Sequence, residues 1–78
     1  MDLAVGSVVI SRAGRDKGVF YAVYALEGSE ALVCDGKLRP VSRPKRKNLK
    51  HLAATHYSVE LADSDKQLRK LLKQYNRN

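Results

Sequence analysis

The sequence predicts a mainly β fold, a small barrel of about five short strands with a C-terminal α-helix packed on it. Short runs of β-branched and aromatic residues, separated by turn signals, fill most of the chain. The last part has leucines at helical spacing instead. The chain has 78 residues, which suits a single domain. We therefore expect the barrel over residues 1–62 and the helix over residues 63–78.

Three strands are expected in the first half of the chain. Residues 5–11 are short and β-branched, residues 19–26 are apolar at nearly every position, and residues 31–35 form a third apolar run. A strand that is apolar on both faces must be covered on both sides, as happens in a barrel or a sandwich. The charged, glycine-containing loop over residues 12–18 suits a tight connection between the first two strands.

A hairpin is expected to follow the third strand. Asp35-Gly36 favours a two-residue type I′ turn, because both central residues of that turn need a positive φ. The return strand would cover residues 37–41, and it would lie at a sheet edge because Pro40 has no N–H group. Residues 49–53 are expected to form a fifth short strand.

A C-terminal helix is expected over residues 64–75. Its apolar stripe, at positions i, i+3, i+4 and i+7, consists of Leu68, Leu71, Leu72 and Tyr75. Ser64, with Gln67 three residues later, matches a capping box. A helix of this length is marginal alone in water, so the stripe must dock on the barrel or on a partner.

Positive charge is concentrated in one segment of the chain. The formal net charge is +7 and the isoelectric point is about 9.9. Residues 37–51 hold seven basic side chains and no acidic one, whereas residues 1–36 hold three basic and five acidic side chains. Charge that served only solubility would be spread out, so this concentration predicts a polyanionic partner.

The sequence has no pair of cysteines, no signal-peptide pattern and no membrane-spanning stretch, and these features bear on the cellular compartment. The single cysteine, Cys34, excludes an internal disulfide and fits a reducing compartment. Residues 1–6 do not have the basic segment followed by an apolar run that is typical of a signal peptide. No stretch of the sequence has the length of a membrane span. We therefore expect a cytoplasmic, monomeric protein with no membrane partner.

The sequence contains no catalytic or metal-binding constellation. It has no Ser/His/Asp set in a supporting context, and the loop over residues 12–18 lacks the Gly-Lys-Ser/Thr ending of a P-loop. His51 and His56 have no neighbouring cysteine or carboxylate cluster, whereas zinc usually takes four ligands. The protein is therefore expected not to be an enzyme and to need no cofactor or metal.

The first half of the chain resembles a KOW motif. Gly6-Ser7-Val8-Val9-Ile10 matches the first apolar strand of the motif, and the next apolar strand runs through Val23. The basic loop between them ends in Lys17-Gly18, with Gly18 at the position of the hallmark glycine. Tyr21 stands where many members have a second glycine. The resemblance implies an SH3-like barrel.

The resemblance extends over residues 4–75. The stretch Lys45-Arg46-Lys47-Asn48-Leu49-Lys50-His51-Leu52, Thr55 and a helix opened by Ser64-Asp65 are similar to the archaeal and eukaryotic KOW-containing large-subunit ribosomal proteins of the fourteen-e type. Small bacterial KOW-domain RNA-binding proteins share this layout. The similarity implies an RNA-binding, ribosome-associated protein whose partner is large-subunit ribosomal RNA, with ribosomal proteins as further candidates.

Twelve residues are expected to bind RNA. Most of them carry a positive charge that can neutralise a phosphate and release counterions. They are Arg12, Arg15, Lys17, Lys37, Arg39, Arg43, Lys45, Arg46, Lys47, Asn48, Lys50 and His51. Asn48 and His51 would add hydrogen bonds or stacking to the charge contacts.

Both basic segments also have an ordinary structural explanation. The run over residues 43–50 could be a solvated surface, and the loop over residues 12–17 could be a plain connection in which Asp16 pairs with a neighbouring Arg or Lys. If both segments bind RNA, they are expected to lie together on one face of the barrel. Replacing residues 45–47 together with alanine is then expected to weaken RNA binding and to leave the fold intact.

Two other functions stay open at this point. SH3-like barrels also bind peptides in aromatic-lined grooves, and KOW domains also occur in transcription-associated nucleic-acid-binding factors. Of the five aromatic residues, Tyr21 and Tyr24 lie in an expected core strand, whereas Tyr57 could stack on a base. A salt-insensitive protein partner would favour the peptide-binding module, and a preference for duplex DNA over structured RNA would favour the transcription-associated factor.

Overall fold

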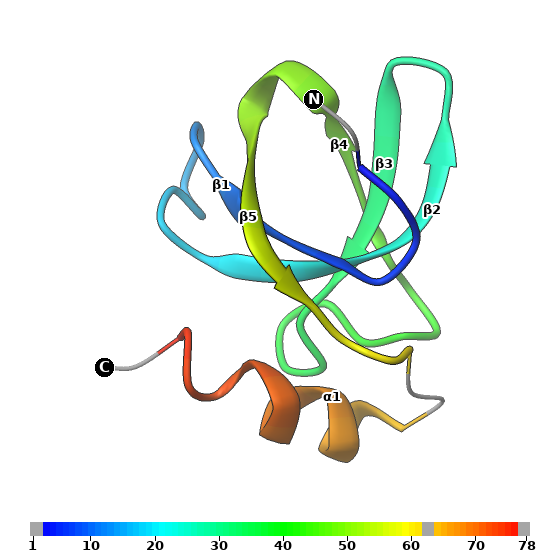
Figure 1. Cartoon of the computed structure of the whole chain (residues 1–78), viewed down its shortest axis with the longest axis vertical. Helices are drawn as coiled ribbons and strands as arrows, with labels where there is room; N and C mark the ends of the chain where they lie inside the picture. The colour runs from blue at the N-terminus through cyan, green and yellow to red at the C-terminus, as the bar shows by residue number, and fades with distance from the viewer. Residues whose placement is uncertain (1–2, 62–63, 77–78) are drawn as a thin grey trace.

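The computed structural model describes residues 3–61 and 64–76. Its elements in chain order are β1 (Ser7–Ser11), β2 (Phe20–Glu27), β3 (Glu30–Cys34), β4 (Lys45–Asn48), the short 3₁₀ helix η1 (Leu49–His51), β5 (Leu52–Ser58) and α1 (Asp65–Leu72). The strands form one antiparallel sheet in the order β4-β3-β2-β1-β5, and α1 lies against it (Figure 1). The mainly β class with a C-terminal helix is thereby confirmed. The expected boundary between barrel and helix, at residues 62 and 63, lies outside the described residues.

The sheet is strongly curled, so its two faces have different neighbours (Figure 1). The buried side chains inside the curl are Val9, Tyr21, Val23, Ala31, Val33 and Leu52. The outer face is covered by α1, and the buried side chains there are Val8, Ala22, Cys34, Leu68 and Leu72. The central strand β2 is therefore covered on both faces, as its apolar sequence predicts.

The edge strands of the sheet are β4 and β5. In the described part of the chain these two strands do not pair with each other, so the hydrogen-bonded sheet is open along this seam. The short helix η1 connects them directly along the chain. Edge strands need protection against pairing with other chains, and inward-pointing charged side chains are one form of it.

The segment after α1 ties the helix to the start of β2. Asn76 Oδ1 accepts the Phe20 N–H at 2.8 Å, and Asn76 Nδ2 donates to Phe20 O at 2.9 Å. Tyr75 packs between Phe20 and Tyr57, with ring centroids 5.6 and 4.7 Å apart respectively. These contacts fix a helix that is too short to be stable by itself.

Most of the expected elements are present. The three strands of the first half differ from the expected bounds by only one or two residues. The helix is also present, although its α-helical part ends at Leu72, and Ser64 is its N-cap with Oγ accepting the Gln67 N–H at 3.4 Å. Among the residues that the structure describes, no helix has the length and apolar character that crossing a membrane requires.

The expected hairpin at Asp35-Gly36 is wrong. The Asp35 carboxylate accepts the backbone N–H groups of Lys37 and Arg39, both at 2.9 Å. These N–H groups are therefore taken by a side chain and are not offered to β3, which is a common competition at aspartate turns. Together with Pro40, which has no N–H group, this turn prevents a return strand over residues 37–41.

Residues 35–44 instead form a loop that packs on α1. Val41 N–H donates to Asp65 Oδ1 at 2.6 Å. Gly36 lies so close to the helix that a Cβ there would be 2.5 Å from Asp65 O and 3.0 Å from Arg69 N. The loop and the first turn of the helix are thus one packed unit.

The basic segment itself supplies the fourth strand. β4 pairs with β3, with Lys45 opposite Val33 and Lys47 opposite Ala31. The fifth strand expected over residues 49–53 is displaced along the chain, because η1 occupies its first part and β5 continues to Ser58.

The thiol of Cys34 is expected to react slowly with an alkylating reagent while the protein is folded. Its side chain is fully buried under α1, and burial raises the pKa of Cys34 to about 11. Less thiolate and less access should slow labelling near pH 8 by at least about 100-fold relative to the protein in urea. Mass spectrometry of timed samples measures this ratio, and equal rates in both conditions would show that the helix does not cover the thiol.

Candidate nucleic-acid interface

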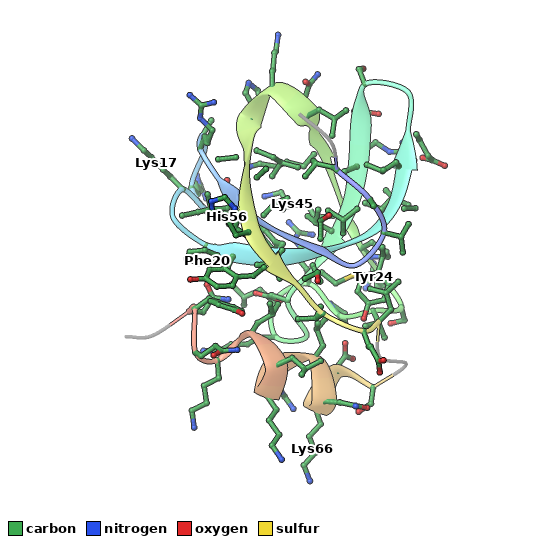
Figure 2. The ribbon with its side chains drawn as sticks, in the orientation of Figure 1. Lys17, Phe20, Tyr24, Lys45, His56 and Lys66 are labelled. Carbon is green, nitrogen blue, oxygen red and sulfur yellow. The ribbon has the colours of Figure 1, made fainter. Side chains whose placement is uncertain are left out.

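Two lysines of β4 point into the curl of the sheet. Lys45 and Lys47 occupy alternate positions of the strand, opposite Val33 and Ala31 of the inner core. Both reach Asp16, which lies in the loop between β1 and β2. Lys47 Nζ is 2.7 Å from Asp16 Oδ1, and Lys45 Nζ is 3.0 Å from Asp16 Oδ2. Figure 2 shows Lys45 inside the ring of strands. The contacts join the edge strand β4 to a loop on the opposite side of the curl.

The remaining acceptor positions of Asp16 are also occupied. Ser11 Oγ lies 2.8 Å from Oδ1, and Tyr21 OH donates to Oδ2 at 2.7 Å. The Asp16 and Lys47 side chains are only 12% and 9% exposed. Buried charges are stable only when they are paired and hydrogen-bonded, and these are both. The group, named the Asp16 cluster below, consists of Ser11, Asp16, Tyr21, Lys45 and Lys47.

The electrostatics of the Asp16 cluster keep its carboxylate charged. Burial by itself raises the pKa of Asp16, but the hydrogen bonds from the two lysines and the two hydroxyls outweigh burial and hold this pKa well below its usual value of 3.8. Burial and the hydrogen bond to Asp16 raise the pKa of Tyr21. The Asp16 carboxylate is therefore ionised, and the Tyr21 hydroxyl protonated, at ordinary pH values.

The other two residues of β4 also have partners within the chain. Arg46 points to the opposite side of the strand, where its Nη1 is 2.7 Å from Glu27 Oε1 and 3.2 Å from Glu30 Oε1. These carboxylates raise the pKa of Arg46. Asn48 is the N-cap of η1, because its Oδ1 accepts the Lys50 N–H at 3.0 Å.

These contacts change the expected effect of replacing residues 45–47 with alanine. Replacing residues 45–47 with alanine would leave the buried carboxylate of Asp16 without a cation, so the fold is not expected to remain intact. The structural explanation for the loop, in which Asp16 pairs with a basic residue, agrees with the contacts. Its lysines come from β4, however, and not from the loop itself.

Exposed basic side chains gather where the β1–β2 loop meets η1. We name this group the loop–turn surface; it consists of Arg12, Arg15, Lys17, Lys50 and His51, all of which are exposed. The two segments are joined by a hydrogen bond from Arg12 N–H to His51 O at 2.8 Å. In the described part of the chain no member forms an ion pair, and Lys17 points away from the ribbon (Figure 2).

The other predicted site residues lie elsewhere. Lys37, Arg39 and Arg43 are exposed in the loop over residues 35–44, which packs on α1. The two segments that were expected to lie together, over residues 12–17 and 43–50, do meet where Asp16 pairs with Lys45 and Lys47. Lys37 and Arg39 belong to neither segment.

The helix adds cations that the sequence reasoning did not include in the site. Lys66, Arg69, Lys70 and Lys73 are exposed on α1 or directly after it. Together with Lys37 and Arg39 they form what we name the helix surface. The spacing of Lys66, Arg69, Lys70 and Lys73, at i, i+3, i+4 and i+7, is the sequence signal that places these four cations on one side of the helix.

A shallow apolar depression borders the loop–turn surface. Its volume is about 340 Å³, and it is lined by Leu3, Leu26, Gly28, Leu49 and Lys50. The lining provides apolar contact and one ammonium group, which suits binding more than acid–base chemistry. Within residues 3–61 and 64–76, no three His, Cys, Asp or Glu side chains gather as a metal site would need.

The aromatic residues differ in how far they are buried. All five are described, and Tyr57 is the one whose side chain is exposed, at 52%. Tyr21 is part of the inner core, and Phe20, Tyr24 and Tyr75 pack at the outer core.

Comparison of the sequence with protein-family models and with curated proteins gives no match.

Proposed function

We propose that this protein binds structured RNA through the loop–turn surface, that its target is ribosomal RNA of the large subunit, and that its curled sheet is an SH3-like barrel of the KOW type. The observation that carries the proposal is the meeting of two basic segments at one end of the sheet. The nearest buried acid, Asp16, is neutralised by Lys45 and Lys47 and does not compete for the exposed cations.

Hydrogen bonds hold the backbone that carries the exposed cations before any ligand binds. Arg12 N–H donates to His51 O, Lys17 N–H donates to Gly14 O at 3.2 Å, and Lys50 N–H donates to Asn48 Oδ1. Fixed backbone positions reduce the ordering cost of binding. The two arginines can pair with phosphates in a bidentate manner, and His51 can stack on an unpaired base.

Structured RNA suits this surface better than a peptide does. Phosphate contacts by Lys and Arg position a protein on a backbone without reading its sequence, so the shape of an A-form helix and its loops would provide the selectivity. A peptide-binding function would need an aromatic-lined groove, whereas one of the five aromatic side chains is buried in the inner core and three more are partly buried against the outer core.

The test is a titration of a fluorescent RNA hairpin and a DNA duplex of equal length between about 50 and 300 mM KCl. We expect tighter binding of the RNA, and for four phosphate contacts a slope of log K against log salt of about −3 to −4. A preference for the DNA duplex would favour the transcription-associated function instead.

A matched pair of variants locates the binding site. The loop–turn variant carries Arg12→Gln, Arg15→Gln, Lys17→Gln and Lys50→Gln, and the helix variant carries Lys66→Gln, Arg69→Gln, Lys70→Gln and Lys73→Gln. Both lose four charges, but the loop–turn variant should bind the hairpin at least about 30-fold more weakly with a flatter salt slope, and the helix variant less than about 5-fold more weakly. Unchanged affinity and slope in the loop–turn variant would refute the proposal.

A further inference from the structure

The basic residues of α1 form one stripe along the helix. Lys66, Arg69, Lys70 and Lys73 follow one another at i, i+3, i+4 and i+7, which places them on one side of the cylinder. Leu68 and Leu72 lie on another side, where they are buried against the sheet. The stripe therefore faces away from the core, and Lys66 extends into solvent in Figure 2.

The loop over residues 35–44 widens this stripe. Gly36 lies against Asp65 and Arg69, so the neighbouring Lys37 and Arg39 are held beside the first turn of the helix. Both are exposed. The helix surface thus brings together six cations from two segments that are far apart in the sequence.

The acids beside the helix surface are already engaged. Asp35 is buried, and its carboxylate accepts the N–H groups of Lys37 and Arg39. Asp65 Oδ1 accepts the Val41 N–H. In the described residues no cation of the helix surface is part of an ion pair.

This arrangement leaves like charges next to one another on α1. Pairs of like charge at i, i+3 or i, i+4 destabilise a helix, and in the described part of the helix Asp65, four residues before Arg69, is the only acid placed to offset them. A polyanion lying along the stripe would remove the repulsion and gain from counterion release.

A membrane surface is a poorer occupant than a nucleic acid. Helices that lie in a membrane interface bury an apolar face in the lipid. The apolar face of α1 is not available for this, because Leu68 and Leu72 are already covered by the sheet. Three of the four helix cations are lysines, which suit sequence-independent contact with a phosphate backbone.

The helix surface and the loop–turn surface lie on opposite parts of the molecule. In Figure 2 Lys17 extends to the left from the loop between β1 and β2, whereas Lys66 extends downward from the side of the helix that faces away from the sheet. The protein measures 28 × 24 × 23 Å, and a short duplex is too stiff to bend around it and contact both surfaces at once.

We propose that the helix surface binds a second segment of structured RNA, so that one protein molecule joins two RNA segments. The inference rests on the proposed function of the loop–turn surface. It adds a partner for the second surface, and it gives the C-terminal helix a direct role in binding.

The test uses two short RNA duplexes of ~12 base pairs, one carrying a donor fluorophore and the other an acceptor. Wild-type protein at half the total duplex concentration is expected to produce energy transfer between the duplexes. The helix variant is expected to bind one duplex with nearly wild-type affinity and to produce no transfer. Analytical ultracentrifugation should give complexes of one protein with two duplexes for the wild type and with one duplex for the helix variant.

The outcomes separate this inference from the proposed function. If the helix variant still joins the two duplexes, or if the wild type binds a single duplex at saturation, the second surface does not bind RNA and the inference is overturned. If the loop–turn variant still joins the two duplexes, its surface is not a binding site and the proposed function itself fails. Binding of the helix surface to vesicles of anionic lipid without energy transfer between duplexes would also overturn the inference. The circular dichroism spectrum and the Cys34 labelling rate of each variant confirm that it is folded.

Discussion

Replacing Asp16 with asparagine is expected to lower the free energy of unfolding by about 3 kcal/mol, because removing one partner of a buried ion pair leaves the other charges uncompensated. Lys47 is 9% exposed and would keep only a weaker amide acceptor and a backbone carbonyl. Lys45 would then face Lys47 without the carboxylate that separates their charges. Urea unfolding at pH 7 measures the loss.

Two further variants make this result specific. Glu27→Gln makes the same chemical change at an exposed partner of Arg46, and its effect should stay below about 0.5 kcal/mol. Adding Lys47→Met to Asp16→Asn should recover part of the loss, since an apolar side chain tolerates the uncharged site better than an unpaired ammonium does. If Asp16→Asn is as mild as Glu27→Gln, the Asp16 cluster does not hold the curl together.

The difference between the wild type and Asp16→Asn should depend on pH in a defined direction. The pKa of Asp16 is lower in the folded protein than its usual value of 3.8. Its contribution is therefore complete above the pKa of the unfolded chain and is lost as the pH falls toward the folded pKa. The stability difference should stay constant from pH 7 to pH 5 and narrow steadily below pH 4. A stability difference that stays constant down to pH 2 would show that it does not come from the ionised carboxylate of Asp16.

The second large effect is expected for Gly36→Ala, at about 3 kcal/mol. Gly36 has φ +78°, which a residue with a Cβ adopts only with strain, and the new methyl group would lie 2.5 Å from Asp65 O. The loop over residues 35–44 would have to move away from α1, and the hydrogen bond from Val41 to Asp65 would be lost with it. Thermal unfolding measures the loss, and faster labelling of Cys34 would report an undocked helix.

Gly28→Ala is the matched control for this prediction. Gly28 has φ +59° and no atom within 4 Å of the position where a Cβ would lie. An alanine at position 28 would therefore have a similar backbone strain but no collision. The substitution should lower the free energy of unfolding by about 1 kcal/mol. Equal effects of the two substitutions would show that strain alone, and not the contact with the helix, makes Gly36 necessary.

Local signals predicted the elements that depend on local chemistry. The three apolar strands and the capped helix follow from periodicity, β-branching and the Ser64 cap, and each is present. The hairpin failed because Asp35-Gly36 permits several turns, and the choice depended on where the Asp35 carboxylate found donors and on the contact between Gly36 and α1. That contact joins residues about 30 positions apart in the sequence, and no local pattern encodes it.

The candidate site shows the same limit more sharply. The basic residues at positions 45–47 have low strand propensity, and their sequence is typical of a solvated surface. They nevertheless form a strand, in which each of them makes an ion pair with Asp16 or with one of two glutamates. Net charge showed that cations are concentrated over residues 37–51. It could not tell which cations are used inside the chain and which are left for a partner, because that depends on long-range pairing.

The hydrogen-bond pattern of the sheet also sets when this protein can fold during its own synthesis. β1 pairs with β2 on one side and with β5 on the other, and Phe20 is held by Asn76 at the far end of the chain. A nascent chain can form the local β1–β2–β3 meander early, but β1 has no second neighbour until Ser58 has left the ribosome. Folding is therefore expected to be completed only after Asn76 has emerged from the ribosome, with the edge of β1 unprotected until β5 has emerged.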